Sequence, residues 1–267
     1  MADDPKSSKF KDLGLRSVVA VFGGALVIWV VYGSEFYFYA LFGILTTLGF
    51  YEAVSINALR NLRRKEDSDL FERGQLAMPI IALCITPFLA IIPKTLSVIS
   101  SLSVLLGLKY KRFIFWVYPF QVLAGFAAAV WLRVVFSMDH LMMLLIATWS
   151  SDIGAYLVGV NFGKTPLAPT ISPKKTWEGT VGGLVMSILA ASAFGWSIDQ
   201  PLLGFVFGTI CGAIGPMGDL SESRLKRAAG VKDSAGYIPG HGGVLDRFDA
   251  FIVNAPFCFL AAYWFAF

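Results

Sequence analysis

Residues 140–160 read HLMMLLIATWSSDIGAYLVGV, an apolar run in which Asp152 is the one acidic or basic side chain apart from a histidine at its start. A helix of about 20 mostly apolar residues crosses the roughly 30 Å hydrocarbon core of a bilayer. The whole chain of 267 residues is 56% hydrophobic and only 15% charged, with a mean hydropathy of +0.67. Soluble domains carry about 25% charged residues. The composition therefore predicts an integral membrane protein and excludes intrinsic disorder, a disulfide scaffold and an ordinary cytosolic enzyme.

Further apolar runs lie on both sides of this one. Together they predict an all-α, polytopic bundle of about nine membrane-spanning helices, at 15–32, 36–57, 75–92, 95–108, 113–136, 140–160, 178–197, 201–218 and 248–267. The run at 95–108 is short and follows the preceding run after only Pro93 and Lys94. The alternative for these two runs is a helical hairpin that crosses part of the bilayer.

Basic residues are distributed unevenly between the connecting segments. All Lys and Arg residues except Lys94 and Arg133 fall in the N-terminal tail and in alternate loops. Because cytoplasmic loops of membrane proteins carry an excess of Lys and Arg, we expect the N-terminus inside and the C-terminus outside. The same asymmetry accounts for the net charge of +4, so no nucleic-acid partner is expected.

The polar segments are too short to form a separate domain. The longest runs over 219–247, well below the length at which a domain folds alone. Any chemistry is therefore expected at the inner ends of the membrane helices, an arrangement that favours a substrate residing in the membrane.

The first polar region combines Asp152 with the segment SPKKTWEG at 172–179. An ionised group within a span costs about 2.5–3.5 kcal/mol on insertion scales, so a functional role is the default for Asp152; the alternative is a hydrogen-bonded carboxylate that locks helix packing. Ser172 before Pro173 predicts an N-cap followed by proline at the first helical position. Such a helix start favours an anion, and Lys174 and Lys175 add two cations. We expect phosphate binding here, the alternative being two solvated lysines on the cytoplasmic side.

The second polar region begins where the run at 201–218 ends. If the helix continues to residue 228, one of its faces carries Asp219, Ser223 and Lys226 with Arg227. Glu222 and Lys226 have the spacing of an ordinary i, i+4 ion pair.

Asp246 and Asp249 lie one helical turn apart at the start of the last span. Two carboxylates about 4 Å apart repel each other by roughly 4 kcal/mol at an effective dielectric constant of 20. A hard divalent cation removes this repulsion, and few carboxylates combined with substrate phosphates suit Mg²⁺. His241 stands between glycines and is expected to donate to a phosphate rather than to bind a metal.

These residues form a pattern that resembles a known family. The stretch 223–249 reads S-x-L-K-R-x4-K-D-x-A-x2-I-P-x-H-G-G-V-x-D-R-F-D and is similar, position by position, to the signature of phosphatidate cytidylyltransferases (CDP-diacylglycerol synthases). The segment at 172–179 resembles the second conserved segment of that family. The resemblance extends over about 150–267. It divides the chain into N-terminal membrane helices of unassigned role at 1–110 and catalytic membrane helices at 111–267, with the active site on the cytoplasmic side.

The resemblance implies transfer of a cytidylyl group from CTP to phosphatidate, giving CDP-diacylglycerol and pyrophosphate. It implies dependence on Mg²⁺, with a second cation left open, and a location in the bacterial inner membrane. A homodimer is expected from the behaviour of such lipid enzymes.

The resemblance and the residue pattern together assign roles to the candidate residues. The expected cation ligands, which are also catalytic, are Asp219, Asp246 and Asp249, with Ser223 as a further ligand. Contacts to CTP or lipid phosphates are expected from Lys174, Lys175, Lys226, Arg227, Lys232 and Arg247, of which Lys226 and Arg227 are catalytic. Asp152 is expected to line the lower wall of the site and His241 to donate to phosphate.

Three other functions compete with this interpretation. A lipid phosphotransferase that consumes CDP-diacylglycerol would show a D-G-x2-A-R … G-x3-D-x3-D pattern, which the sequence lacks. A CTP-dependent polyprenol kinase would release CDP. A transporter would also place Asp residues in the membrane, but such proteins often contain a repeated half, and no repeat is seen at half length.

Overall fold

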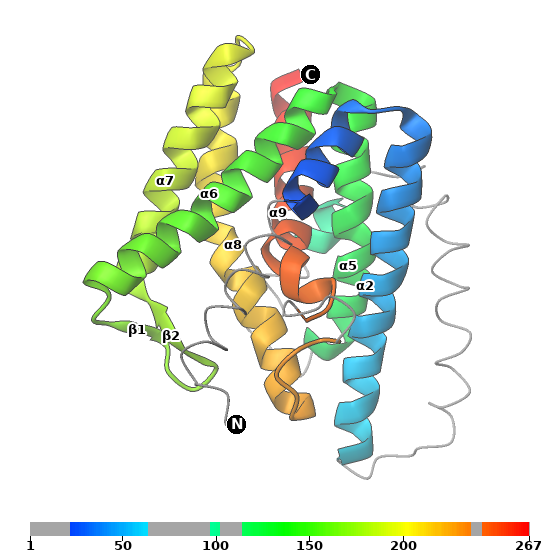
Figure 1. Cartoon of the computed structure of the whole chain (residues 1–267), viewed down its shortest axis with the longest axis vertical. Coiled ribbons are helices and arrows are strands. Elements are labelled where there is room, and N and C mark those ends of the chain that lie inside the picture. The colour runs from blue at the N-terminus through cyan, green and yellow to red at the C-terminus, as the bar shows by residue number, and fades with distance from the viewer. Residues whose placement is uncertain (1–21, 64–96, 102–113, 236–241, 267) are drawn as a thin grey trace, which may run out of the picture.

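The computed structural model describes residues 22–63, 97–101, 114–235 and 242–266. Six long helices account for most of them: α2 (Glu35–Arg63), α5 (Ile114–Trp131), α6 (Met138–Phe162), α7 (Trp177–Ser197), α8 (Pro201–Ala229) and α9 (Leu245–Ala266). A π-helical turn, η1 (Leu132–Phe136), extends α5, and strands β1 (Pro166–Ala168) and β2 (Ser172–Thr176) form an antiparallel hairpin between α6 and α7. In Figure 1, α6 runs diagonally across the bundle from the upper end of α5 to the hairpin, with α7 at one edge, α2 at the other, and α8 and α9 between these edges.

Six of the predicted spans are confirmed as helices long and apolar enough to cross a membrane, as expected for an integral membrane protein. The predicted span at 15–32 is described only over the helix Phe22–Tyr32. Of the run at 95–108, residues 97–101 are described and are helical, and the run at 75–92 lies outside the described residues. The total of nine spans and the orientation of the termini therefore stay predictions.

Glycines allow α7 to lie very close to both of its neighbours. A Cβ atom on Gly183 of α7 would stand 2.7 Å from the Ser151 carbonyl oxygen of α6. On the other side, a Cβ on Gly208 of α8 would stand 2.5 Å from the Cα of Ile188. Helices in a bilayer associate through such small residues because there is little hydrophobic driving force between them. The consequence is a tightly fitted α6–α7–α8 unit that carries the polar segments.

Arg133, one of the two basic residues outside the predicted cytoplasmic loops, has a structural role. Its Nε and one terminal nitrogen donate hydrogen bonds of 2.9 Å to the carbonyl oxygens of Val31 and Gly33. The guanidinium also lies 4.2 Å from the ring centroid of Phe38. Arg133 thereby fixes the turn before α2, which explains its position in the opposite set of loops.

The segments predicted to face the cytoplasm gather at one end of the bundle. In Figure 1 the carboxyl end of α2, the β1–β2 hairpin and the carboxyl end of α8 all lie at the lower end. The α7–α8 turn and the C-terminus lie at the upper end. The fold therefore agrees with the grouping of loops on which the sidedness prediction depends.

The predicted helix start at Ser172 and Pro173 is wrong. Residues Ser172–Thr176 form strand β2, in which Ser172 pairs with Ala168 of β1. The helix begins at Trp177, where the Oγ1 of Thr176 accepts a hydrogen bond of 3.2 Å from the Gly179 amide. Ser and Thr are both good N-caps, and an acidic residue in the first turn, Glu178, stabilises a start at Trp177 through the helix dipole.

Candidate active site

An ion pair joins the β1–β2 hairpin to α8. Lys175 of β2 pairs with Asp219, and the hydroxyl of Ser223 donates to the other Asp219 carboxylate oxygen at 3.4 Å. Because α8 continues without a break to Ala229, Asp219 and Ser223 lie on one face, as predicted. Two segments that are more than 40 residues apart in sequence thus meet at the lower end of the bundle.

Glu178 in the first turn of α7 holds the hairpin in place. Its carboxylate accepts hydrogen bonds of 3.1 Å from the amides of Lys164 and Thr165, and one of 2.8 Å from the Thr165 hydroxyl. The Trp177 amide donates to the Thr165 carbonyl at 2.9 Å. The hairpin is therefore fixed on the end of α7, and neighbouring side chains in a strand point to opposite faces. Lys175 contacts α8 in consequence, whereas Lys174 is exposed.

Lys226 connects α8 to α9 through two carboxylates. Its Nζ lies 2.9 Å from Glu222 Oε2, which confirms the predicted i, i+4 pair, and it also pairs with Asp246. Glu222 is only 1% exposed and Lys226 9%, so this is a buried network rather than an ordinary surface pair. Lys226 is engaged by both carboxylates, a contact with α9 that the sequence pattern does not predict.

Asp246 and Asp249 differ in their surroundings although they are one turn apart. One oxygen of Asp246 pairs with Lys226, and the other accepts hydrogen bonds from the Ser234 amide, the Ser234 hydroxyl and the Gly243 amide at 2.8–2.9 Å. Asp249 accepts a hydrogen bond of 2.7 Å from the adjacent Ala250 amide. Its carboxylate lies within electrostatic range of Asp219 and Glu222.

The carboxylates suit a hard cation only in part. Within the described ranges there is no group of three or more His, Cys, Asp or Glu side chains arranged to hold a metal ion. Both oxygens of Asp246 already accept hydrogen bonds. Both oxygens of Asp219 are engaged too, but more weakly, by a hydrogen bond of 3.4 Å from Ser223 and by a partly exposed ion pair with Lys175. Asp249 lies within electrostatic range of Asp219, and Glu222 Oε1 is buried without a hydrogen-bond partner among the residues that the structure describes. Carboxylate and hydroxyl oxygens are the donors that Mg²⁺ prefers, so Asp219, Asp249 and Ser223 fit the cation better than the fully hydrogen-bonded Asp246 does.

The other predicted residues that the structure describes are exposed. Asp152 is exposed on α6, within electrostatic range of Lys175 and Asp219. Lys232 and Arg247 are exposed. Arg227 is exposed and donates to the Val231 carbonyl at 3.3 Å. His241 lies outside the described residues.

Glu52 of α2 is a member of this network that the sequence pattern did not single out. It is 1% exposed, and it accepts hydrogen bonds from the amides of Val244 and Leu245 and from the Ser234 hydroxyl. Glu52 is an acidic residue inside the apolar run 36–57, just as Asp152 is an acidic residue inside its own span. A search of every span for acidic residues would therefore have identified Glu52.

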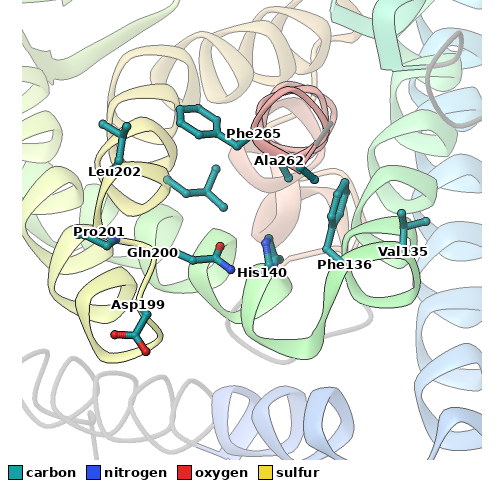
Figure 2. Close-up of a pocket in the computed structure, with 11 residues that line it drawn as sticks. Val135, Phe136, His140, Asp199, Gln200, Pro201, Leu202, Ala262 and Phe265 are labelled. Atoms are coloured by element: carbon teal, nitrogen blue, oxygen red, sulfur yellow. The ribbon is translucent and has the colours of Figure 1, made fainter.

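A cavity at the opposite end of the bundle contains none of these residues. It has a volume of about 540 Å³ and lies between the starts of α6 and α8 and the end of α9, where it is lined by His140, Gln200, Leu203 and Phe265 among others. Figure 2 shows His140 and Gln200 side by side at this cavity. The His140 Nδ1 lies 2.8 Å from the Ser137 hydroxyl. The cavity is separate from the charged network at the lower end.

Comparison with known proteins shows where this arrangement belongs. The sequence model of the cytidylyltransferase family matches residues 14–265. The chain belongs to this family. A Haemophilus influenzae protein named phosphatidate cytidylyltransferase is 44% identical over 124 residues, covering 44% of this chain and 43% of the relative. A Bacillus subtilis protein of the same name is 40% identical over 127 residues, covering 46% of this chain and 47% of the relative. In these matches the chain spans less than half the length of the curated relatives.

Proposed function

We propose that this member of the cytidylyltransferase family transfers the cytidylyl group of CTP to phosphatidate at the cytoplasmic face of a bacterial inner membrane. The observation that carries the proposal is the connection of the two motif segments through Asp219 of α8. Lys175 of the 172–179 segment pairs with Asp219, and Ser223 of the 223–249 segment donates to the same carboxylate, at the end of the bundle where the basic loops gather. The shared name of the relatives supports the same activity.

The proposed reaction exchanges one phosphoanhydride bond for another. An oxygen of the phosphatidate phosphate forms a bond to the α-phosphorus of CTP. The bond from that phosphorus to the oxygen that bridges it to the β-phosphorus breaks, and pyrophosphate leaves with the electron pair. Because the attacking phosphate is already an anion, the protein needs mainly to align the two phosphates and to balance their charge.

The chain's own residues supply that alignment. The cations Lys174, Arg227, Lys232 and Arg247 are exposed and are proposed to contact the phosphates of CTP or of the lipid. Lys175 lies beside Asp219 and is placed to contact a phosphate next to that carboxylate. Asp152, exposed nearby on α6, is proposed to line the wall of the same site.

Magnesium is proposed to bind between α8 and α9. Asp219 and Asp249 would hold it, with Ser223 as a further ligand, and it would neutralise charge on the α-phosphate and on the leaving pyrophosphate. For Asp246 to serve as a third ligand, it would have to give up hydrogen bonds to Ser234 and Gly243. We therefore propose that Asp246 acts mainly by orienting Lys226 and the start of α9.

The domain division follows from the same placement. The proposed substrate and cation contacts all come from residues 111–267, which supports a catalytic unit formed by those helices. Residues 1–110 contribute Glu52, which contacts that unit from α2. The homodimer stays a prediction, which chemical cross-linking in native membranes would test.

Purified protein in mixed phospholipid vesicles provides a direct test. With CTP, phosphatidate and Mg²⁺, we expect pyrophosphate and CDP-diacylglycerol to form in equal amounts, and neither to form when phosphatidate is omitted. Release of CDP with a phosphorylated polyprenol would instead show a kinase. Release of CMP from added CDP-diacylglycerol would show a phosphotransferase. Either of these results, in the absence of pyrophosphate release, would overturn the proposal.

A further inference from the structure

Glu52 is a buried acidic residue within a membrane helix. It lies in α2, and its side chain is almost completely enclosed, with 1% exposed. A carboxylate in such a place is costly unless hydrogen bonds or opposite charges compensate it. Among the ion pairs between described residues, none involves Glu52. The buried charge of Glu52 is compensated by hydrogen bonds from Ser234, Val244 and Leu245, which are all distant from it in sequence.

The donors are the amides at the start of α9. Glu52 Oε1 accepts from the Val244 amide at 2.8 Å, and Oε2 accepts from the Leu245 amide at 2.9 Å. The first amides of a helix have no partners within that helix, and the positive end of the helix dipole favours a negative charge there. Glu52 therefore caps α9 from another helix, and a carboxylate serves this purpose better than any neutral side chain.

Ser234 links this cap to Asp246. The Ser234 hydroxyl lies 2.7 Å from Glu52 Oε2 and 2.9 Å from Asp246 Oδ2. A hydroxyl has one proton to donate, so the two carboxylates share it. The backbone at Gly243 fills the space between these groups, because a Cβ there would overlap with the Ser234 hydroxyl and the Glu52 carboxylate. The geometry thus requires glycine at 243 and brings Glu52, Ser234 and Asp246 into one connected unit.

We infer that Glu52 is a positioning residue for the reaction. By fixing the amides of residues 244 and 245 and sharing the Ser234 hydroxyl, it sets the orientation of Asp246 and, through it, of Lys226. This inference rests on the proposed function and gives the N-terminal helices a part in it. Glu52 contacts no proposed substrate group, so it acts only through the residues that it holds.

The substitution Glu52→Gln tests the inference with almost no change in shape. One carboxylate oxygen becomes an NH2 group, which cannot accept the hydrogen bond that this oxygen receives from the Val244 or the Leu245 amide. We expect kcat per folded molecule to fall by about 10- to 100-fold, the range for loss of a hydrogen bond to a charged group. Glu35→Gln is the matched control, because Glu35 is exposed in the first turn of the same helix. The monodisperse fraction in size-exclusion chromatography gives the amount of folded protein.

A double-substitution cycle with Ser234→Ala separates positioning from a general loss of stability. Because both side chains act on Asp246 through one hydroxyl, the loss in kcat of the double variant should be smaller than the product of the two single losses. Parental kcat in Glu52→Gln would overturn the inference. The inference would also be overturned if the loss in kcat of the double variant equalled the product of the two single losses, because the two residues would then act independently.

Hydrogen exchange provides a measurement that does not depend on activity. Amides 243–247 should exchange faster in Glu52→Gln than in the parent and in Glu35→Gln, while the rest of α9 keeps its protection. Parental exchange at these amides would overturn the anchoring itself. If the parent formed no CDP-diacylglycerol, the proposed function would fail, and the exchange result would still decide whether Glu52 anchors α9.

Discussion

Lys175 of the β1–β2 hairpin forms an ion pair with Asp219 of α8, whereas the adjacent Lys174 is exposed. The two lysines are equivalent in the sequence motif, and the strand gives them different environments because neighbouring side chains point to opposite faces. Lys175 balances the charge of a proposed cation ligand, and Lys174 makes no such contact with α8. Replacing either lysine with alanine changes the composition and the net charge equally, so the two variants can be compared directly.

Lys175→Ala should weaken CTP use more than Lys174→Ala does. Loss of a charged phosphate contact costs about 1.5–3 kcal/mol, so we expect the KM for CTP to rise roughly tenfold or more for Lys175→Ala. Removing Lys175 also leaves Asp219 without its cationic partner and so strengthens its attraction for Mg²⁺, and the Mg²⁺ concentration for half-maximal rate should fall. Initial rates over a grid of CTP and Mg²⁺ concentrations measure both effects. Equal effects of the two substitutions would contradict a special position for Lys175.

Asp249→Asn and Asp246→Asn should differ in their dependence on Mg²⁺. A metal that neutralises charge at the α-phosphate contributes several kcal/mol, so Asp249→Asn should lose about 100-fold or more in turnover. Asp246→Asn should also lose turnover, because it weakens the ion pair that orients Lys226. Asp249→Asn removes a proposed ligand and should shift the Mg²⁺ titration to higher concentration. Asp246→Asn disturbs Lys226 and the start of α9 and should leave the titration midpoint near that of the parent.

The control for this comparison is CDP-diacylglycerol formation at saturating Mg²⁺. Partial recovery of Asp249→Asn there, with little recovery of Asp246→Asn, would agree with the assignment. The reverse pattern would make Asp246 a cation ligand, the role that the sequence analysis predicted for it jointly with Asp219 and Asp249.

The helices were predictable because each span is a continuous apolar run, which can be recognised from its local composition. Residues 178–197 and 201–218 read as spans without any knowledge of their neighbours, and the structure confirms both as helices. The start of α7 was not predictable in the same way, since Ser172 and Thr176 are both acceptable caps. The choice between them depends on β1, which pairs with Ser172, and on Thr165 just before β1, whose carbonyl oxygen accepts from the Trp177 amide.

The site was predictable in its residue types and less so in its pairings. The spacing of Glu222 and Lys226 on one helix indicated their contact, because helix geometry alone fixes it. The contacts of Lys226 with Asp246 and of Glu52 with Val244 join segments that no local pattern relates. Such contacts depend on how α2, α8 and α9 pack, and burial makes the loss of one partner costly.

The sidedness of the bundle is testable by cysteine labelling. In a variant with Cys84, Cys211 and Cys258 replaced, Lys174→Cys should react with a membrane-impermeant maleimide only when the cytoplasmic face is open. Gln200→Cys, at the α7–α8 turn on the opposite end, should react from the outside of intact cells. A cysteine at Lys65 should behave like the one at Lys174. Reaction of 65 and 174 from opposite sides would contradict the nine-span arrangement, most directly in the region of 75–108.

Lys226 is expected to be essential for stability as well as for activity. Removing one partner of a buried ion network leaves an uncompensated charge and costs about 3–5 kcal/mol. Lys226→Met should therefore lower the thermal unfolding temperature in detergent markedly, because Glu222 and Asp246 both lose their cation. Lys226→Met combined with Glu222→Leu removes one of the stranded charges, and it should regain much of the stability while staying inactive, since Asp246 still lacks its partner. Thermal unfolding and CDP-diacylglycerol formation, measured on the same preparations, separate the two roles. Parental unfolding in Lys226→Met would show that Lys226 is not part of a buried network, and recovered activity in the double variant would show that its pairing with Asp246 is dispensable.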